Sequence, residues 1–468
     1  MGQTAAESVK KMQISEEIRR AADLAEEEMS GVFRRIDRIA RANTEHVLDC
    51  FREAQVSESL FAPSTGYGYG DVGRDRIDGL AAAVFRAPAG FMRPSLLSGT
   101  HTLTVMLFGV LRPGDIMLSV TGVPYDTILP VIGIDDRGEP LDRPQPDAGS
   151  GSGISEGSLR DWGVEFRSVP LLKETRGAAG PVDLEAVKQA MAEAGDRLRM
   201  VYVQRSRGYA DRPSLRVREI RRTAKFVFDA ARELGIPKPV FAVDNCYGEF
   251  VEETEPCYVP DGADDEAPAD LMAGSLIKNP GGGMADVGGY IVGGEELARL
   301  CGNRLTSPGV GLEVGASLGQ NRNLIKGLFY APHTVAEALK TAHLAAYLLG
   351  RMGYRTSPSW EEERADIVQC VECASPEGLT AFCRGIQSAS PIDAHVTPEA
   401  WDMPGYADPV IMAAGAFTGG ASIELSADGP MRPPYTAFMQ GGLTYESARL
   451  AVMSAADRIA RERVGKAE

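Results

Sequence analysis

The chain has 468 residues, 44% hydrophobic and 24% charged, which is ordinary for a globular protein and enough for more than one domain. The formal net charge of -16 argues against a nucleic-acid partner, because phosphate binding requires a basic face. No apolar run reaches the ~20 residues of a membrane span, and the polar residues 1–20 hold no signal-peptide core, so we expect no membrane partner and a cytoplasmic location.

The N-terminal region is helical in pattern from about residue 15 to residue 55, with Ser15 as the expected N-cap. A helical arm of this length packs either on a second subunit or on its own domain. Residues 66–73 follow, with the sequence GYGYGDVG. These residues satisfy GxGxxG, but no strand precedes them, so we interpret them as a loop and not as a dinucleotide site.

A short strand leads into Ser98, Gly99 and Thr100, and an apolar helix begins there. Free backbone N–H groups and the helix dipole make such a helix start a potential anion site, although an ordinary capped helix has the same pattern. The next buried strand, 115–120, ends shortly before Tyr125, which places an aromatic side chain near the same site.

Two further apolar strands end in polar residues that carry chemistry. Asp244 lies at the end of the expected strand 238–245, and Lys278 directly follows the apolar run 271–277. Asn-Pro and three glycines come directly after Lys278. An acid and a lysine at neighbouring strand ends suit pyridoxal phosphate, with Asp244 on the pyridine nitrogen and Lys278 on the aldehyde carbon. A solvated lysine at a strand end is the alternative.

Alternating strands and helices from about 90 to 300 predict an α/β fold with a mainly parallel sheet. We expect a helical arm at 1–60, a large cofactor-binding domain at 61–330 and a smaller α/β domain at 331–468. Strands are expected at 411–416 and 422–425. Cys370 and Cys373 form a single CxxC with no second pair and no nearby His, so we expect no metal and reduced thiols.

The chain resembles the fold-type I pyridoxal-phosphate enzymes, and more closely the "methionine gamma-lyase / aluminium resistance protein" family. The resemblance runs from about Gly66 to Leu450. It rests on the segments GYGYGDVGRD, SGTHT, PYDT, QRSRGY, VDNCYGEFVE, AGSLIKNPGGG, SPGVGLEVGA, SPIDAHVTPEAWDMPGY and IELSADGPMRPPY.

The resemblance implies a role for each matching residue. Lys278 matches the lysine that binds the cofactor covalently, Asp244 the acid on the pyridine nitrogen, and Tyr125 the aromatic on the cofactor ring. The phosphate cradle corresponds to Ser98, Gly99, Thr100 and Ser275. In the broader group, a Tyr-x-Arg loop from the neighbouring subunit also holds the phosphate.

The nearest equivalent of that loop here is Tyr67-x-Tyr69, which lacks the arginine, and Arg74 is a candidate replacement. The substrate carboxylate suits a bidentate arginine, and we favour Arg432, in the loop after the last expected strands, with Arg384 as the second candidate. Gly70 and the pair Asp286-Val287 depart from the family pattern, which suggests an altered substrate or neutral drift.

The resemblance therefore implies a lyase that eliminates at Cγ or Cβ of a small amino acid, as a homodimer or homotetramer with shared active sites. Lys278 would act as the base at Cα and Cβ, and Tyr125 as the acid for the leaving group. One specialised relative releases chloride from a chlorinated allylglycine and forms the alkyne propargylglycine. Transamination or racemisation on the same scaffold, and a non-catalytic stress protein that binds the cofactor, are the alternatives.

Overall fold

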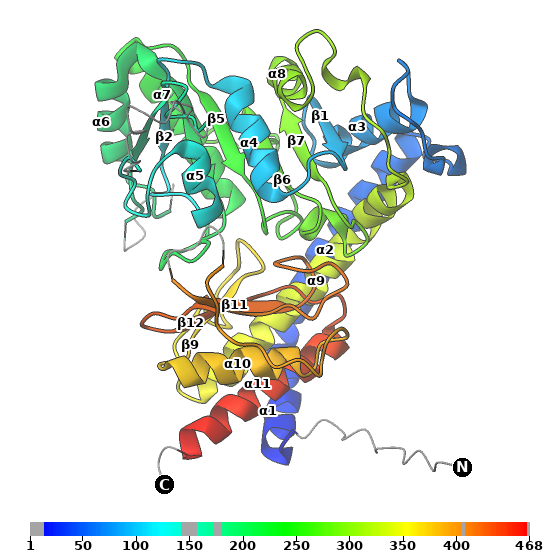
Figure 1. The fold of residues 1–468 in the computed structure, drawn as a ribbon, viewed down its shortest axis with the longest axis vertical. Helices are drawn as coiled ribbons and strands as arrows, with labels where there is room; N and C mark the ends of the chain where they lie inside the picture. The colour runs from blue at the N-terminus through cyan, green and yellow to red at the C-terminus, as the bar shows by residue number, and fades with distance from the viewer. Residues whose placement is uncertain (1–13, 142–156, 173–179, 404–407, 466–468) are drawn as a thin grey trace, which may run out of the picture.

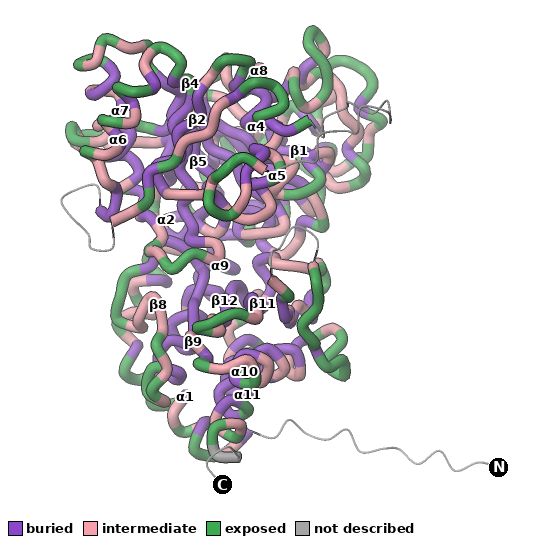
Figure 2. The backbone as a smooth tube through the Cα atoms, turned by 60° about the vertical axis from the view of Figure 1, so that its left-hand side comes forward, coloured by how far each residue is buried: buried purple, intermediate pink, exposed green. Residues whose placement is uncertain are grey.

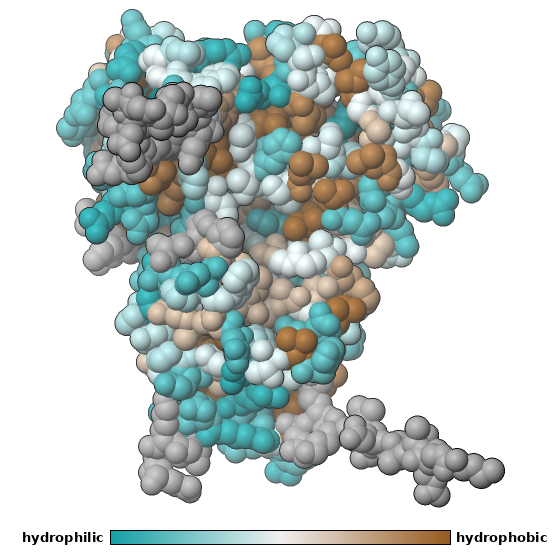
Figure 3. All heavy atoms as spheres, viewed as in Figure 1, coloured by the Kyte–Doolittle hydropathy of each residue, from teal (hydrophilic) through white to brown (hydrophobic). Residues whose placement is uncertain are grey.

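The computed structural model describes residues 14–141, 157–172, 180–403 and 408–465. Figure 1 shows a larger domain above a smaller one, with long helices running between them. In the space-filling view, hydrophobic side chains gather mainly over the larger domain on this face (Figure 3). Among the described residues, no helix is long and apolar enough to cross a bilayer.

The larger domain is built on a seven-stranded sheet. Its order is β1(Ala89–Arg93), β7(Gly289–Gly293), β6(Leu271–Ser275), β5(Val240–Asp244), β4(Leu198–Gln204), β2(Ile116–Ser119) and β3(Glu165–Ser168). The pairs from β6 through β3 are parallel, and only β7 runs against its two neighbours. The mainly parallel sheet predicted from the sequence is therefore confirmed.

Helices cover both faces of this sheet. One face packs against α3(Val72–Val84), α6(Leu184–Ala194) and α7(Val217–Leu234), and the other against α4(Gly99–Val110), α5(Leu129–Ile132) and α8(Glu295–Leu305). Successive strand residues alternate between the two cores, as the pleat requires: Val201 and Val203 face one, Met200 and Tyr202 the other. The tube view shows the central strands β2, β5 and β6 in the colour of buried residues (Figure 2), whereas the edge strand β3 is partly exposed.

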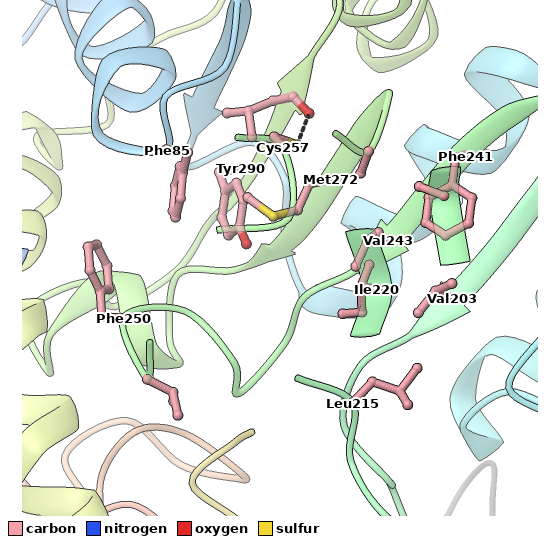
Figure 4. Close-up of a cluster of buried hydrophobic side chains, with 14 of the residues drawn as sticks. Phe85, Val203, Leu215, Ile220, Phe241, Val243, Phe250, Cys257, Met272 and Tyr290 are labelled. Atoms are coloured by element: carbon pink, nitrogen blue, oxygen red, sulfur yellow. Dashed lines mark hydrogen bonds between the residues drawn. The ribbon is translucent and has the colours of Figure 1, made fainter. Parts of the chain in front are cut away.

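The first of these cores contains an aromatic stack that fixes the strands near the site. The rings of Phe85 and Tyr290 are stacked with their centroids 4.4 Å apart, and Phe250 lies 5.9 Å from Phe85 (Figure 4). Such pairs contribute roughly 0.5–1.5 kcal/mol beyond the area that they bury. They attach β7 to the segment that follows β5.

The smaller domain holds an antiparallel sheet. Its order is β10(Val410–Ala413), β11(Ser426–Pro430), β12(Thr436–Gln440), β9(Gln369–Glu372) and β8(Thr356–Ser357), packed on α10(Pro376–Gln387) and α11(Tyr445–Gly465). The strand expected at 422–425 was wrong in position, because the ladder begins at Ser426. Ser422 instead supports a turn, in which its hydroxyl accepts from the Glu424 N–H.

The N-terminal helices fold onto their own chain. In α1(Glu16–Glu28), Ile18 and Ala22 belong to the core of the smaller domain, whereas in α2(Ser30–Glu53), Ile36 and Val47 belong to the core of the larger one. Glu26 of α1 also accepts a hydrogen bond from the Tyr445 hydroxyl at 3.1 Å. The expected arm is thus divided between the two domains.

One helix, α9(Asn321–Arg351), passes through both domains. Its residues up to Leu339 contribute to the larger core, and those from Leu344 onward to the smaller one. The expected boundary at residue 330 therefore falls inside a continuous helix.

Candidate active site

The carboxyl ends of β4, β5 and β6 lie side by side and carry the predicted chemistry. Gln204 at the end of β4 is in register with Asp244 at the end of β5, which is in register with Ala273 of β6. Lys278 follows three residues after the last residue of β6, directly before the short helix η4(Asn279–Gly281). Ligands of open α/β sheets bind at this edge of the sheet.

Lys278 and Asp244 line one cavity of about 220 Å³. The structure brings most of the other predicted residues to the same cavity: Gly99, Thr100, Tyr125 and Ser275. Ser98 is adjacent but does not line it, because its hydroxyl caps α4 by accepting from the His101 N–H at 3.1 Å.

The Lys278 amine lies over an aromatic face inside this cavity. Its Nζ is 4.0 Å from the centroid of the Tyr247 ring, and the Tyr247 hydroxyl donates to the Ala421 carbonyl at 3.2 Å. Burial lowers the pKa of Lys278, but neighbouring acidic groups, Cys246 and Tyr247 first and then Asp244, outweigh burial and raise that pKa above its ordinary value. The ring and the acid hold Nζ in place as an ammonium group.

The start of α4 offers the group that a phosphate would need. The Ser275 hydroxyl is buried and has no hydrogen-bond partner among the described residues. It lies against the helix start, since a Cβ at Gly99 would come within 3.3 Å of the Ser275 Cβ. A buried hydroxyl without a partner beside the N-terminus of a twelve-residue helix fits an anion. With Lys278 and Asp244 in the same cavity, the residues fit pyridoxal phosphate.

Tyr125 is held at the edge of the cavity by its neighbours. Its backbone N–H donates to the Gln204 side chain at 2.6 Å, and its ring packs edge-on against Tyr209 with centroids 5.7 Å apart. Gly208 has φ of 58°, and a Cβ there would lie 2.8 Å from the Tyr125 ring. Stacking of Tyr125 on the cofactor ring stays a prediction.

The smaller domain adds an acid that the sequence did not reveal. Asp428 of β11 lines the Lys278 cavity and accepts a hydrogen bond from the Tyr209 hydroxyl. Burial raises the pKa of Asp428 to about 6, opposed by the Tyr209 bond and, more weakly, by the charge of Lys278. The sequence hinted at this residue by placing an acid inside the largely apolar IELSADGP segment. Only the tertiary structure brings that strand to the cavity.

A second acid missed from the sequence lies beneath the cavity. Glu249 is fully buried, and its Oε1 accepts from the Tyr290 hydroxyl at 2.7 Å. Burial raises the pKa of Glu249 to about 8, so at neutral pH it is mostly a neutral carboxyl group. A Cβ at Gly274 would come within 2.4 Å of Glu249 Oε1, which explains the glycine at this position of β6.

None of the predicted arginines lines the Lys278 cavity. Arg432 is paired with Asp408 at 2.8 Å, and Arg384 on α10 donates to the Pro398 carbonyl at 3.1 Å. Arg74 donates to the Gly66 carbonyl at 3.2 Å, so it supports the glycine loop. In the part of the chain that the structure describes, the lining of this cavity contains no arginine at all.

The tyrosines of the glycine loop also lie outside the cavity of their own chain. Tyr67 is 86% exposed and Tyr69 is 78% exposed. The departures at Gly70, Asp286 and Val287 do not line the cavity either. Within one chain, the structure therefore gives no support to the expectation that these departures alter the substrate.

The cysteines do not assemble a metal site in the described residues. Cys370 and Cys373 are buried free thiols, as are the other five cysteines. No group of three or more His, Cys, Asp or Glu side chains with metal-binding geometry occurs in the described ranges.

Comparison with known proteins places the whole chain in one family. The family model for methionine gamma-lyase matches residues 18–460. The uncharacterized Bacillus subtilis protein YnbB is 45% identical over 96% of this chain and 97% of its own.

Solved structures agree with this result. A Clostridium novyi carbon-sulfur lyase involved in aluminum resistance superimposes with a TM-score of 0.84 at 38% identity, covering 98% of this chain and 100% of its own. A Listeria monocytogenes protein, provisionally assigned as a cystathionine beta-lyase involved in aluminum resistance, has a TM-score of 0.83 at 44% identity, with 94% and 100% covered.

The position of Lys278 predicts the site of covalent cofactor attachment. We expect borohydride reduction of the purified protein to fix pyridoxal phosphate on Lys278, as read by peptide mass mapping. Lys278→Ala should lose the adduct, whereas the control Lys326→Ala should keep it, because Lys326 lies over Tyr330 on α9, away from the cavity. An adduct on any other lysine would refute the assignment.

The raised pKa of Asp428 predicts a pH-dependent effect on stability. This carboxyl has a pKa of about 6 in the fold against an ordinary value of 3.8, so its ionisation destabilises the fold as the pH rises through that window. Relative to wild type, Asp428→Asn should therefore gain stability as the pH rises from 4 to 7.5. At about 1.4 kcal/mol per pKa unit, the gain is up to about 3 kcal/mol.

Urea unfolding of both proteins across this pH range measures the effect. Loss of the Tyr209 bond adds only a pH-independent offset. Asp265→Asn is the matched control, because its hydrogen bond to Arg222 holds the pKa of Asp265 below the ordinary value, outside the window. An equal pH response of the two variants would contradict the burial of a titrating Asp428.

Proposed function

We propose that this chain, a member of the methionine gamma-lyase family, is a pyridoxal-phosphate-dependent carbon–sulfur lyase that acts at Cγ or Cβ of a small amino acid. The fold is that of fold-type I pyridoxal-phosphate enzymes. The observation that carries the proposal is a single cavity that holds Lys278, Asp244 and the Ser275 hydroxyl, which has no hydrogen-bond partner among the described residues.

The residues of this cavity divide the work between binding and proton transfer. When bound, pyridoxal phosphate supplies an electron sink that acidifies the Cα–H bond of the amino acid. Asp244 would accept a hydrogen bond from the protonated ring nitrogen. Ser275 and the N–H groups at the start of α4 would hold the phosphate. Lys278 Nζ would take the proton from Cα and, for a Cγ elimination, a second proton from Cβ.

The surroundings of Lys278 hold the free amine in its protonated form. The Tyr247 face, 4.0 Å from Nζ, stabilises the protonated amine without forming an ion pair. Burial favours the neutral form, but the neighbouring acidic groups outweigh burial and raise the pKa of Lys278, so the amine would act as a base only after giving up this proton. The Tyr125 hydroxyl would protonate the leaving group, since Tyr125 lines the same cavity.

The reaction type is tested with amino acids deuterated at Cβ. We expect a homocysteine-type thioether deuterated at Cβ to lose label to solvent and to release thiol, 2-oxoacid and ammonia in equal amounts. A cysteine-type thioether should give the same products and keep its label, because elimination at Cβ needs no proton from Cβ. Transamination would retain the label, release no thiol and convert the cofactor to its amine form.

A panel of leaving groups addresses the finer alternatives. It includes methionine, other γ-substituted amino acids and a γ-chlorinated allylglycine, with thiol and halide read separately. If the enzyme releases halide with an alkynyl product and no thiol from any sulfur substrate, the carbon–sulfur lyase proposal is wrong. The specialised alkyne-forming reaction would then take its place. Cofactor on Lys278 without turnover of any substrate would favour the non-catalytic alternative.

We further propose that the active sites are shared in a homodimer or homotetramer. Two aromatic side chains that are 86% and 78% exposed, Tyr67 and Tyr69, are unusual on a free surface, and they lie on a loop that matches a partner-contacting loop of the broader group. The Lys278 cavity also has no arginine of its own chain among the described residues.

The seven free thiols support a cytoplasmic location.

Mixing of two inactive variants tests the shared site. If the partner's loop completes the site, a Lys278→Ala protein and a Tyr67→Ala/Tyr69→Ala protein should each be inactive, and each mixed dimer should regain one of its two sites. Light scattering measures the assembly at the assay concentration. A fully active monomer would reject the proposal.

A further inference from the structure

A second cavity adjoins the one that holds Lys278. It has a volume of about 100 Å³, and Tyr209 and Phe438 line both cavities. The two rings pack against each other with centroids 4.8 Å apart. The Tyr209 hydroxyl donates a hydrogen bond to Asp428 in the Lys278 cavity. A wall of two aromatic side chains thus separates this second cavity from the candidate active site.

Three arginines line the second cavity, and two of them are neutralised by carboxylates. Arg355 is paired with Glu372 and lies 3.5 Å from Asp211, and both acids also line the cavity. Arg432 is paired with Asp408 at 2.8 Å. The charges of these two arginines are therefore balanced within the protein.

Arg207 is the exception. Its side chain is buried, with the residue 4% exposed, yet among the described residues it forms no ion pair. Its Nη1 donates to the Ser357 hydroxyl at 2.9 Å and to the Cys370 sulfur at 3.4 Å, and its buried Nε has no acceptor within the described ranges. Burial raises the pKa of Cys370 to about 11, so this sulfur is a neutral thiol and supplies no charge.

The charges of Asp366 and Arg207 both act on the pKa of Cys370, but Asp366 accepts hydrogen bonds from other donors. Asp366 accepts the hydroxyls of Ser206 at 2.6 Å and Ser214 at 2.5 Å through one oxygen, and the Val368 N–H at 3.1 Å through the other. Burying a guanidinium without a carboxylate partner costs free energy, because the charge loses its hydration and gains no negative charge in return. Such a group facing a cavity is suited to an anionic ligand.

We propose that Arg207 is the centre of a carboxylate-binding subsite behind the Tyr209–Phe438 wall. The planar fork of a guanidinium matches a carboxylate better than a point-like anion, and the Ser357 hydroxyl and Thr436 on the same lining add polar groups. The carboxylate is either that of a free small acid or that at the end of a substrate side chain. The second source rests on the proposed lyase function, and the first does not.

Binding of the free acid is tested with the purified holoenzyme and two isosteric probes, propionate and propionamide. Propionate should raise the Tm of wild type in a concentration-dependent way, and the neutral amide should not. Arg207→Gln should lose the response, with affinity falling roughly tenfold or more. It should also unfold at the same or a higher Tm than wild type without propionate, because it removes an unpaired buried charge.

Arg355→Gln is the matched control, since Arg355 lines the same cavity but has its own carboxylate partners, and it should keep the propionate response. If Arg207→Gln does not fold, Arg207→Lys decides, because it keeps the charge and loses the fork. A response of equal size in Arg207→Lys, or to propionamide, overturns the carboxylate subsite.

The substrate source is tested by comparing S-(2-carboxyethyl)-L-cysteine with S-propyl-L-cysteine, together with their homocysteine counterparts. If the subsite holds a side-chain carboxylate, Arg207→Gln should lower kcat/KM roughly tenfold or more for the acids and leave the propyl compounds unchanged. An unchanged ratio, with the propionate response intact in wild type, assigns the subsite to free acids. If Arg207→Gln alters neither measurement, the proposal is wrong, whether or not the lyase activity is found.

Discussion

The geometry of the candidate site depends on one buried arginine, Arg205. Its guanidinium is fully buried, and it donates to Glu252 and Asn245, both at 2.9 Å, and pairs with Glu255 at 3.4 Å. These contacts tie the residue after β4 to the whole segment that follows β5. Gly248 is required there, since a Cβ would come within 2.4 Å of Arg205 Cδ. The position of Tyr247 under Lys278 follows from this attachment.

Arg205 and Arg207 show how the same side chain takes opposite roles two residues apart. Arg205 points into the protein and meets two carboxylates, so its charge is balanced and its role is structural. Arg207 is nearly as deeply buried, but in the described part of the chain its guanidinium donates only to a hydroxyl and a thiol. Buried charges are normally paired, so the unbalanced one is the more informative of the two.

The sequence was sufficient for the parts of the site that local pattern determines. Asp244 ends β5 and Lys278 follows the end of β6 by three residues, so the register of these parallel strands brings both side chains to one cavity. Asp428 could not be found in this way, because an antiparallel strand of another domain reaches the cavity only through tertiary packing. Arg432 was favoured from its loop, but a neighbouring acid that pattern alone does not reveal, Asp408, neutralises it.

The continuity of α9 limits how a substrate can reach Lys278. The cavity is walled by both domains, and a rigid helix of 31 residues belongs to the cores of both. Rotation of one domain away from the other would have to bend this rod, and Pro332 is the position in it where a backbone donor is already missing. Reorientation of a wall side chain such as Tyr209 would open the cavity and leave α9 straight.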